Sequence, residues 1–161
     1  MKRSLLLSAL AAGSLVLVGS SIATAFAGSI VPFTGTVINS CILTVGTPGV
    51  MAPSSDYTVL GSKQAGGTSG VVTAVSTGTT FQVSVDAPSS FTLAPTGGNT
   101  SVSFATRYSG VGATNIGSTP GTTATALSSG VTVLTVDLAA TKSTGVFTQG
   151  SYTAEAVVRC E

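Results

Sequence analysis

Apolar and polar residues alternate along most of this chain, and this alternation predicts short β-strands. The first run covers residues 31–45, where Val31, Phe33 and Val37 begin the apolar face of one long strand. Pro32 lacks a backbone N–H, so we expect this end of the strand at a sheet edge. Further runs follow at residues 57–60, 70–76, 79–85, 90–93, 101–108, 131–140 and 152–160.

Three segments carry more specific predictions. Residues 70–76 and 79–85 are separated by a short linker with Gly78 and predict a β-hairpin. Residues 131–140 are apolar on both faces, which predicts a central strand. Residues 109–130 are rich in Gly, Ser and Thr, and they predict a long loop or a weakly formed edge.

The runs together indicate an all-β fold of about seven or eight strands. Gly and Pro turns separate the strands, and no amphipathic helix of useful length is predicted. This pattern is typical of an antiparallel β-sandwich or barrel. An outer-membrane barrel is the alternative, but the runs are too short to cross a bilayer and aromatic girdles are missing.

The first residues predict a cleaved signal peptide. Met1-Lys2-Arg3 is a basic start, residues 5–18 are apolar, and Ala25-Phe26-Ala27 fits an A-x-A cleavage site. A retained anchor is the alternative, but the apolar stretch is shorter than the roughly 20 residues that a span needs. We expect removal of residues 1–27 and a single domain over residues 28–161. It would lie in the periplasm, on the cell surface or outside the cell, with no membrane span after cleavage.

Charged residues are scarce, and this limits the classes of partner. They make up 7% of the chain, against about a quarter in typical domains. No basic patch exists, which excludes nucleic acid as a partner. A weakly charged surface of Ser, Thr and Gly instead suits repeated self-association.

Cys41 and Cys160 bracket almost the whole chain after the predicted cleavage site. Thiols pair in an oxidising compartment, so we expect an intramolecular disulfide, with free thiols or an intermolecular bridge as alternatives. The bridge requires the first and last strands to lie side by side, with Cα atoms about 5.5–6 Å apart. Immunoglobulin-like sandwiches satisfy this condition.

Side chains suited to catalysis are few. The chain has no His and no Trp, so the commonest general base and zinc ligand are missing, and no G-x-S-x-G motif occurs. Asp86 and Asp137 are candidates for a cation site or a glycosidase pair, with solvated strand ends as the alternative. Tyr57, Tyr108 and Tyr152 are candidates for stacking on sugars, with core packing as the alternative. We expect no enzyme, no cofactor and no metal.

Both ends of the chain carry recognisable motifs. Residues 31–41 read V-x-F-x-G-x-V followed by a cysteine, and residues 150–158 begin with a G-x-Y motif at Gly150 and Tyr152. Residues 103–108 read SFATRY. These stretches resemble the opening, the last strand and the "ARY" strand of chaperone–usher fimbrial subunits, the pilins. The resemblance covers about a quarter of the chain beyond residue 27.

The resemblance implies an incomplete immunoglobulin-like sandwich, which a strand from a neighbouring subunit completes along an exposed edge. Because such a contact does not close on itself, it produces polymers. Val31, Phe33, Gly35 and Val37 become candidates for the exchanged or edge strand. Like subunits or a periplasmic chaperone become candidate partners. We therefore expect a non-catalytic structural or adhesive surface subunit.

Two departures from the pilin pattern support an alternative. The second pilin cysteine would fall near Val75-Ser76, whereas here it is Cys160, and this bridge would seal the groove that a donor fills. Only residues 28–30 precede the opening motif, which is too short for a donor segment. The alternative is a self-complete monomeric module that binds a carbohydrate or a protein partner through residues 109–130 and nearby tyrosines.

Overall fold

The computed structural model describes residues 29–161, so the predicted signal peptide, residues 1–27, lies outside the described part. The described part is all β, as the alternation predicts, and its strands form two antiparallel sheets. The chain divides between Gly35 and Thr36, and Thr36–Glu161 is one compact unit. Among the described residues no helix is long and apolar enough to cross a membrane.

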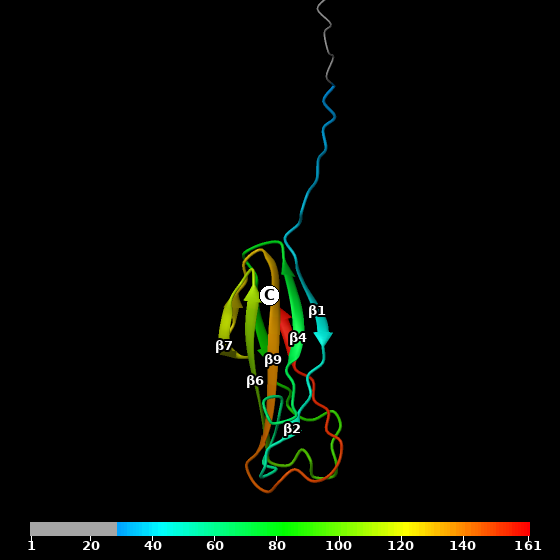
Figure 1. Ribbon diagram of the computed structural model, residues 1–161, viewed down its shortest axis with the longest axis vertical. Coiled ribbons are helices and arrows are strands. Elements are labelled where there is room, and N and C mark those ends of the chain that lie inside the picture. The colour runs from blue at the N-terminus through cyan, green and yellow to red at the C-terminus, as the bar shows by residue number, and fades with distance from the viewer. Residues whose placement is uncertain (1–28) are drawn as a thin grey trace, which may run out of the picture. The chain divides into compact units, whose positions relative to one another are not determined.

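The larger sheet has seven strands, and the longest of them is central. The central strand is β9 (Gly130–Lys142), which pairs along one edge with β6 (Val102–Gly112) and along the other with β4 (Gly70–Ser76) and then β3 (Val59–Gly61). Three outer strands follow: β1 (Cys41–Thr47) beside β4, β7 (Ile116–Pro120) beside β6, and β2 (Ala52–Pro53) beside β3. Figure 1 shows β1, β4, β9 and β6 side by side. The predicted central position of residues 131–140 is confirmed.

The smaller sheet has three strands, and the core lies between the two sheets. β5 (Gln82–Asp86) is flanked by β10 (Val157–Cys160) and β8 (Thr125–Ala126). Alternate residues of both sheets point inward, and Ala74, Leu134, Val83 and Val85 are fully buried. The predicted antiparallel sandwich is therefore confirmed.

The predicted hairpin between residues 70–76 and 79–85 is wrong. β4 pairs with β1 and β9 in the larger sheet, whereas β5 pairs with β10 and β8 in the smaller one. The chain therefore crosses from one sheet to the other after Ser76. Alternation shows which face of each strand is apolar, but it does not show which strand lies beside it.

Residues 109–130 form a weak edge, which was one of the two predictions, and not the long loop that was the other. β6 continues to Gly112, β7 lies at an edge of the larger sheet, and the short β8 lies at an edge of the smaller one. Backbone pairing and polar contacts order this segment despite its few apolar residues, since Arg107 donates from Nη2 to the carbonyl of Ser118 at 2.9 Å. The Gly121 N–H donates to the carbonyl of Thr106 at 2.8 Å, and an added Cβ at Gly121 would collide with Thr106. Sequence reasoning missed this close approach.

Tyr108 is a core residue and not a ligand-stacking one. Its side chain is 1% exposed, and its hydroxyl lies 2.9 Å from the carbonyl oxygen of Val83 and 2.7 Å from that of Thr123. The hydroxyl also lies 2.7 Å from Oγ1 of Thr125. Tyr108 thus ties β6 of the larger sheet to the smaller sheet, and it is inaccessible to a sugar.

Candidate functional site

The segment that carries Val31, Phe33, Gly35 and Val37 does not form the first strand. A single strand over residues 31–45 was predicted, but β1 begins at Cys41, and no strand is assigned to residues 29–40. Val31 is 67% exposed, Phe33 93% and Val37 81%. Every residue from 29 to 39 is exposed, so the alternating apolar side chains of this segment have the period of a strand but are not covered by the described chain.

Hydrogen bonds at the end of β4 explain why pairing stops at this point. The side-chain hydroxyl of Thr77 accepts from the Ser40 N–H at 2.7 Å and donates to the Ile38 carbonyl at 2.6 Å. The amide of Asn39 donates to the hydroxyl of Thr80 at 2.9 Å. β4 ends at Ser76, so it offers no further backbone groups to continue the ladder beyond this point.

The predicted disulfide between Cys41 and Cys160 is present, with Cα atoms 6.3 Å apart. No free cysteine is left in residues 29–161. Cys41 is the first residue of β1 and Cys160 is the last of β10, so the bridge joins the edges of two different sheets. The first and last strands are neighbours as predicted, but they belong to separate ladders.

A groove opens between these two edges. Within the described chain, β1 is hydrogen-bonded only to β4, and β10 only to β5, so each strand has one free edge. The groove has a volume of about 560 Å³, and its walls are β1 with the turn after it and residues 154–158. Apolar side chains form its floor, among them Val72, Val136 and Leu138. Neither cysteine lines the groove, so the disulfide lies beyond its end and leaves it open, contrary to the expectation that the bridge would seal it.

The residues of the last run show that the sandwich is incomplete beside this groove. Ala154, Ala156 and Val158 alternate with exposed residues and contact the core, yet they are only half-buried. Facing them, Val45 of β1 is 71% exposed. Inward-facing apolar residues stay this accessible when the strand that would cover them is missing. Apolar and polar residues alternate as regularly in residues 31–37 as in residues 152–160. This shared alternation is the sequence signal that could have revealed the groove.

The start of the last run is less regular than predicted. β10 covers only residues 157–160, and before it Thr153 makes an isolated bridge to Leu93. An added Cβ at Gly150, which has a φ of +150°, would collide with the ring of Pro95. The Tyr152 ring packs at 5.0 Å from the Phe91 ring, and its hydroxyl donates to the Thr148 carbonyl at 3.0 Å. Gly150 and Tyr152 therefore position the wall of the groove.

The predicted pair of Asp86 and Asp137 is not formed. Asp86 lies on β5, where Arg159 Nε donates to it at 2.5 Å, and Asp137 lies on β9 in the other sheet, beside Lys63 at 3.2 Å. Among the described residues no cluster of three or more His, Cys, Asp or Glu side chains could hold a metal ion. Cross-sheet placement separates the two carboxylates, which the sequence could not show.

Asp137 instead supports the groove floor. Burial alone would raise its pKa, but hydrogen bonds from Ser69 at 2.5 Å and Ser62 at 2.8 Å, with the ammonium of Lys63, outweigh this and lower the pKa. Ser62 is itself buried and lines the groove. These bonds are stronger to the ionised carboxylate, and the ion pair with Lys63 requires it, so protonation weakens the attachment of Ser62 to β9.

We expect the ionisation of the Asp137 carboxylate to make the free energy of unfolding depend on pH. Its folded pKa lies below the unfolded value near 3.9, so its contribution is present above about pH 4 and is lost as pH falls through the folded pKa. Asp137→Asn should lower the free energy of unfolding at pH 7, and the gap to the parent should narrow below about pH 4. Denaturant unfolding from pH 7 to pH 2.5 measures this gap. Glu155→Gln controls for loss of one carboxylate, and a gap that stays constant with pH would contradict the prediction.

The chain matches no protein-family model, and no curated protein or solved structure matches it significantly.

Proposed function

We propose that this protein is a non-catalytic structural subunit of an exported surface polymer, in which the groove of one copy receives residues 29–37 of the next. One observation carries the proposal: an exposed segment with alternating apolar residues occurs in the same chain as an apolar groove between two unpaired strand edges. The resemblance of the chain ends to pilins points the same way. A periplasmic chaperone that holds the groove before assembly is the partner this resemblance implies.

The donor segment and the groove wall match in length and pattern. Residues 31–37 and residues 154–160 each extend about 23 Å at about 3.3 Å per residue. Val31, Phe33 and Val37 lie on one face of the segment, and Ala154, Ala156 and Val158 face inward along the wall. An inserted strand gains backbone hydrogen bonds from the free edge of β10 and covers the half-buried apolar wall.

The contact is heterologous, because the donor and the acceptor are different surfaces of the same chain. A contact of this kind generates an open filament when its rotation does not close a ring. The disulfide supports an oxidising location, which agrees with the predicted signal peptide. We propose no enzymatic role, since the chain lacks His and its two candidate carboxylates lie in separate sheets.

Charge reversal on the donor face tests strand donation. The purified protein should form a ladder of non-covalent oligomers in gels run without boiling, and Val37→Asp or Phe33→Asp should abolish the ladder. Burying an unpaired carboxylate costs several kcal/mol, which corresponds to a loss of affinity of about a hundredfold or more. Thr34→Asp adds the same charge to the opposite face of the segment and should leave the ladder intact.

Two outcomes would contradict the proposal. A parent protein that stays strictly monomeric at high concentration would favour the self-complete module. A ladder that Thr34→Asp and Val37→Asp weaken equally would show that the segment acts through its charge or its flexibility and not through its apolar face.

A further inference from the structure

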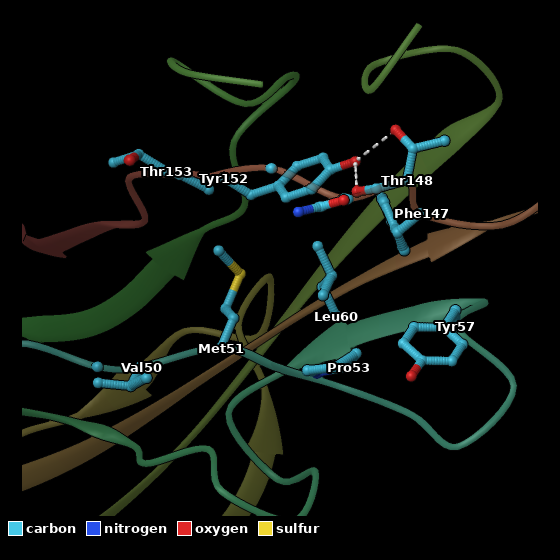
Figure 2. A pocket seen from close by; sticks show the side chains of 13 residues that line it. Val50, Met51, Pro53, Tyr57, Leu60, Phe147, Thr148, Tyr152 and Thr153 are labelled. Carbon is cyan, nitrogen blue, oxygen red and sulfur yellow. Dashed lines mark hydrogen bonds between the residues drawn. The ribbon is translucent and has the colours of Figure 1, made fainter. Parts of the chain in front are cut away.

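A second cavity lies at the far end of the groove from the disulfide and differs from the groove in character. It has a volume of about 760 Å³, within the range of small-molecule sites. Leu60 and Phe147 are its buried apolar base, and Thr148, Gln149 and Thr153 contribute neutral polar groups. No charged side chain lines it among the described residues. Figure 2 shows Tyr152 and Thr148 on one side of the cavity and Tyr57 with Pro53 on the other.

Tyr57 lies at the rim of this cavity, in a backbone conformation that suits glycine or asparagine. Its φ is +57°, which is costly for a bulky side chain, and the residue is 56% exposed. The turn holds it there, because the Tyr57 N–H donates to the Ser54 carbonyl at 3.0 Å and its own carbonyl accepts from the Phe147 N–H at 2.8 Å. An exposed aromatic ring that makes the fold less stable is a marker of a binding surface.

The opposite wall is held by contacts within the chain. The Tyr152 hydroxyl donates to the Thr148 carbonyl, and the Tyr152 ring packs edge-on against the Phe147 ring at 5.4 Å. These contacts orient Tyr152, whereas the ring of Tyr57 is exposed to solvent. The cavity thus combines aromatic faces with neutral hydrogen-bonding groups at its rim.

We infer that this cavity binds a neutral saccharide unit, a role separate from strand donation. The apolar C–H face of a sugar ring packs on an aromatic face, and its hydroxyls suit the hydroxyls of Thr148 and Thr153 and the amide of Gln149. A charged ligand would find no opposite charge in the lining. A wholly apolar ligand would bury the polar groups without partners, which is unfavourable.

An array of several hundred neutral and acidic oligosaccharides, probed with the purified protein, tests this inference. We expect saturable binding to at least one neutral glycan, and Tyr57→Gly should weaken binding to that glycan by about tenfold or more. The thermal midpoint of Tyr57→Gly should be no lower than that of the parent, because the change relieves the left-handed backbone. This separates loss of a ligand contact from loss of fold.

Ser101 provides a matched control, since among residues 29–161 it is the other non-glycine residue with a φ of +57° and it does not line the cavity. Ser101→Gly should leave glycan binding unchanged. Binding of acidic glycans alone, no saturable binding on the array, or full binding by Tyr57→Gly would overturn the inference. A peptide of residues 29–39 that displaces the glycan would assign the cavity to the donor segment instead, and would leave strand donation standing.

Discussion

Replacing both Cys41 and Cys160 with serine is expected to lower the free energy of unfolding by about 2–5 kcal/mol. The disulfide spans 119 positions of sequence, for which the chain-entropy model gives about 5 kcal/mol. It also joins β1 and β10, which belong to different sheets and share no ladder. No backbone pairing replaces the bridge when it is removed, so the two edges are free to part.

Denaturant unfolding of the parent and the double variant, with and without reductant, measures this effect. Reductant should lower the stability of the parent toward that of the double variant and should leave the double variant unchanged. Amide exchange should rise first in β1 and β10, because these strands lose their only cross-link. A loss below about 1 kcal/mol, or two thiols that alkylate in the native parent, would contradict the prediction.

Adding the donor peptide to a chain that lacks residues 1–37 is expected to raise its melting temperature by about 10 °C or more. The truncated chain keeps residues 38–40, which hold the start of β1 through Thr77. A ligand at a thousand times its dissociation constant stabilises by about 4 kcal/mol, and each kcal/mol shifts the melting temperature of a domain this size by about 3–5 °C. Thermal unfolding with a peptide of residues 29–39 measures the shift.

Matched peptides make this experiment specific for the apolar face of the donor. A peptide with Phe33→Asp and Val37→Asp should give no shift, whereas one with Thr34→Asp and Thr36→Asp should act nearly as the parent peptide. Equal shifts with both peptides would contradict insertion in the groove. The same truncated chain with Tyr57→Gly should still respond to the parent peptide, which keeps this test independent of the saccharide cavity.

Local patterns predicted where the strands lie better than they predicted which strands pair with one another. The alternation of residues 101–108 and 131–140 indicated β6 and β9 correctly, because the period of two reflects which face is buried. The same period in residues 70–76 and 79–85 suggested a hairpin that does not form, since Val83 and Val85 face Ala74 from the opposite sheet. Residues 109–130 were predicted as a loop or a weakly formed edge, and the sequence could not decide between them because backbone pairing in β7 needs few apolar side chains.

The candidate site shows the same limit. The motif of Val31, Phe33, Gly35 and Val37 was found in the sequence and was predicted both as the start of the first strand and, through the pilin resemblance, as a candidate exchanged or edge strand. A strand inside a sheet and a strand that awaits a partner have the same alternation. Tyr57 and Tyr152 were named in the sequence as candidates for stacking on sugars, but nothing there placed them at one cavity, because its lining comes from segments nearly a hundred residues apart in sequence.

The sequence by itself determined that the chain is an all-β sandwich, which faces of its strands are apolar, and that Cys41 and Cys160 pair. These features depend on local periodicity and on there being only two cysteines. Only the tertiary structure decided that β1 and β10 border a groove, that Tyr108 is buried, and that Tyr57 stands open at a cavity. Strand order and edge exposure arise from contacts between residues distant in the chain, and no local pattern encodes which edge remains unpaired.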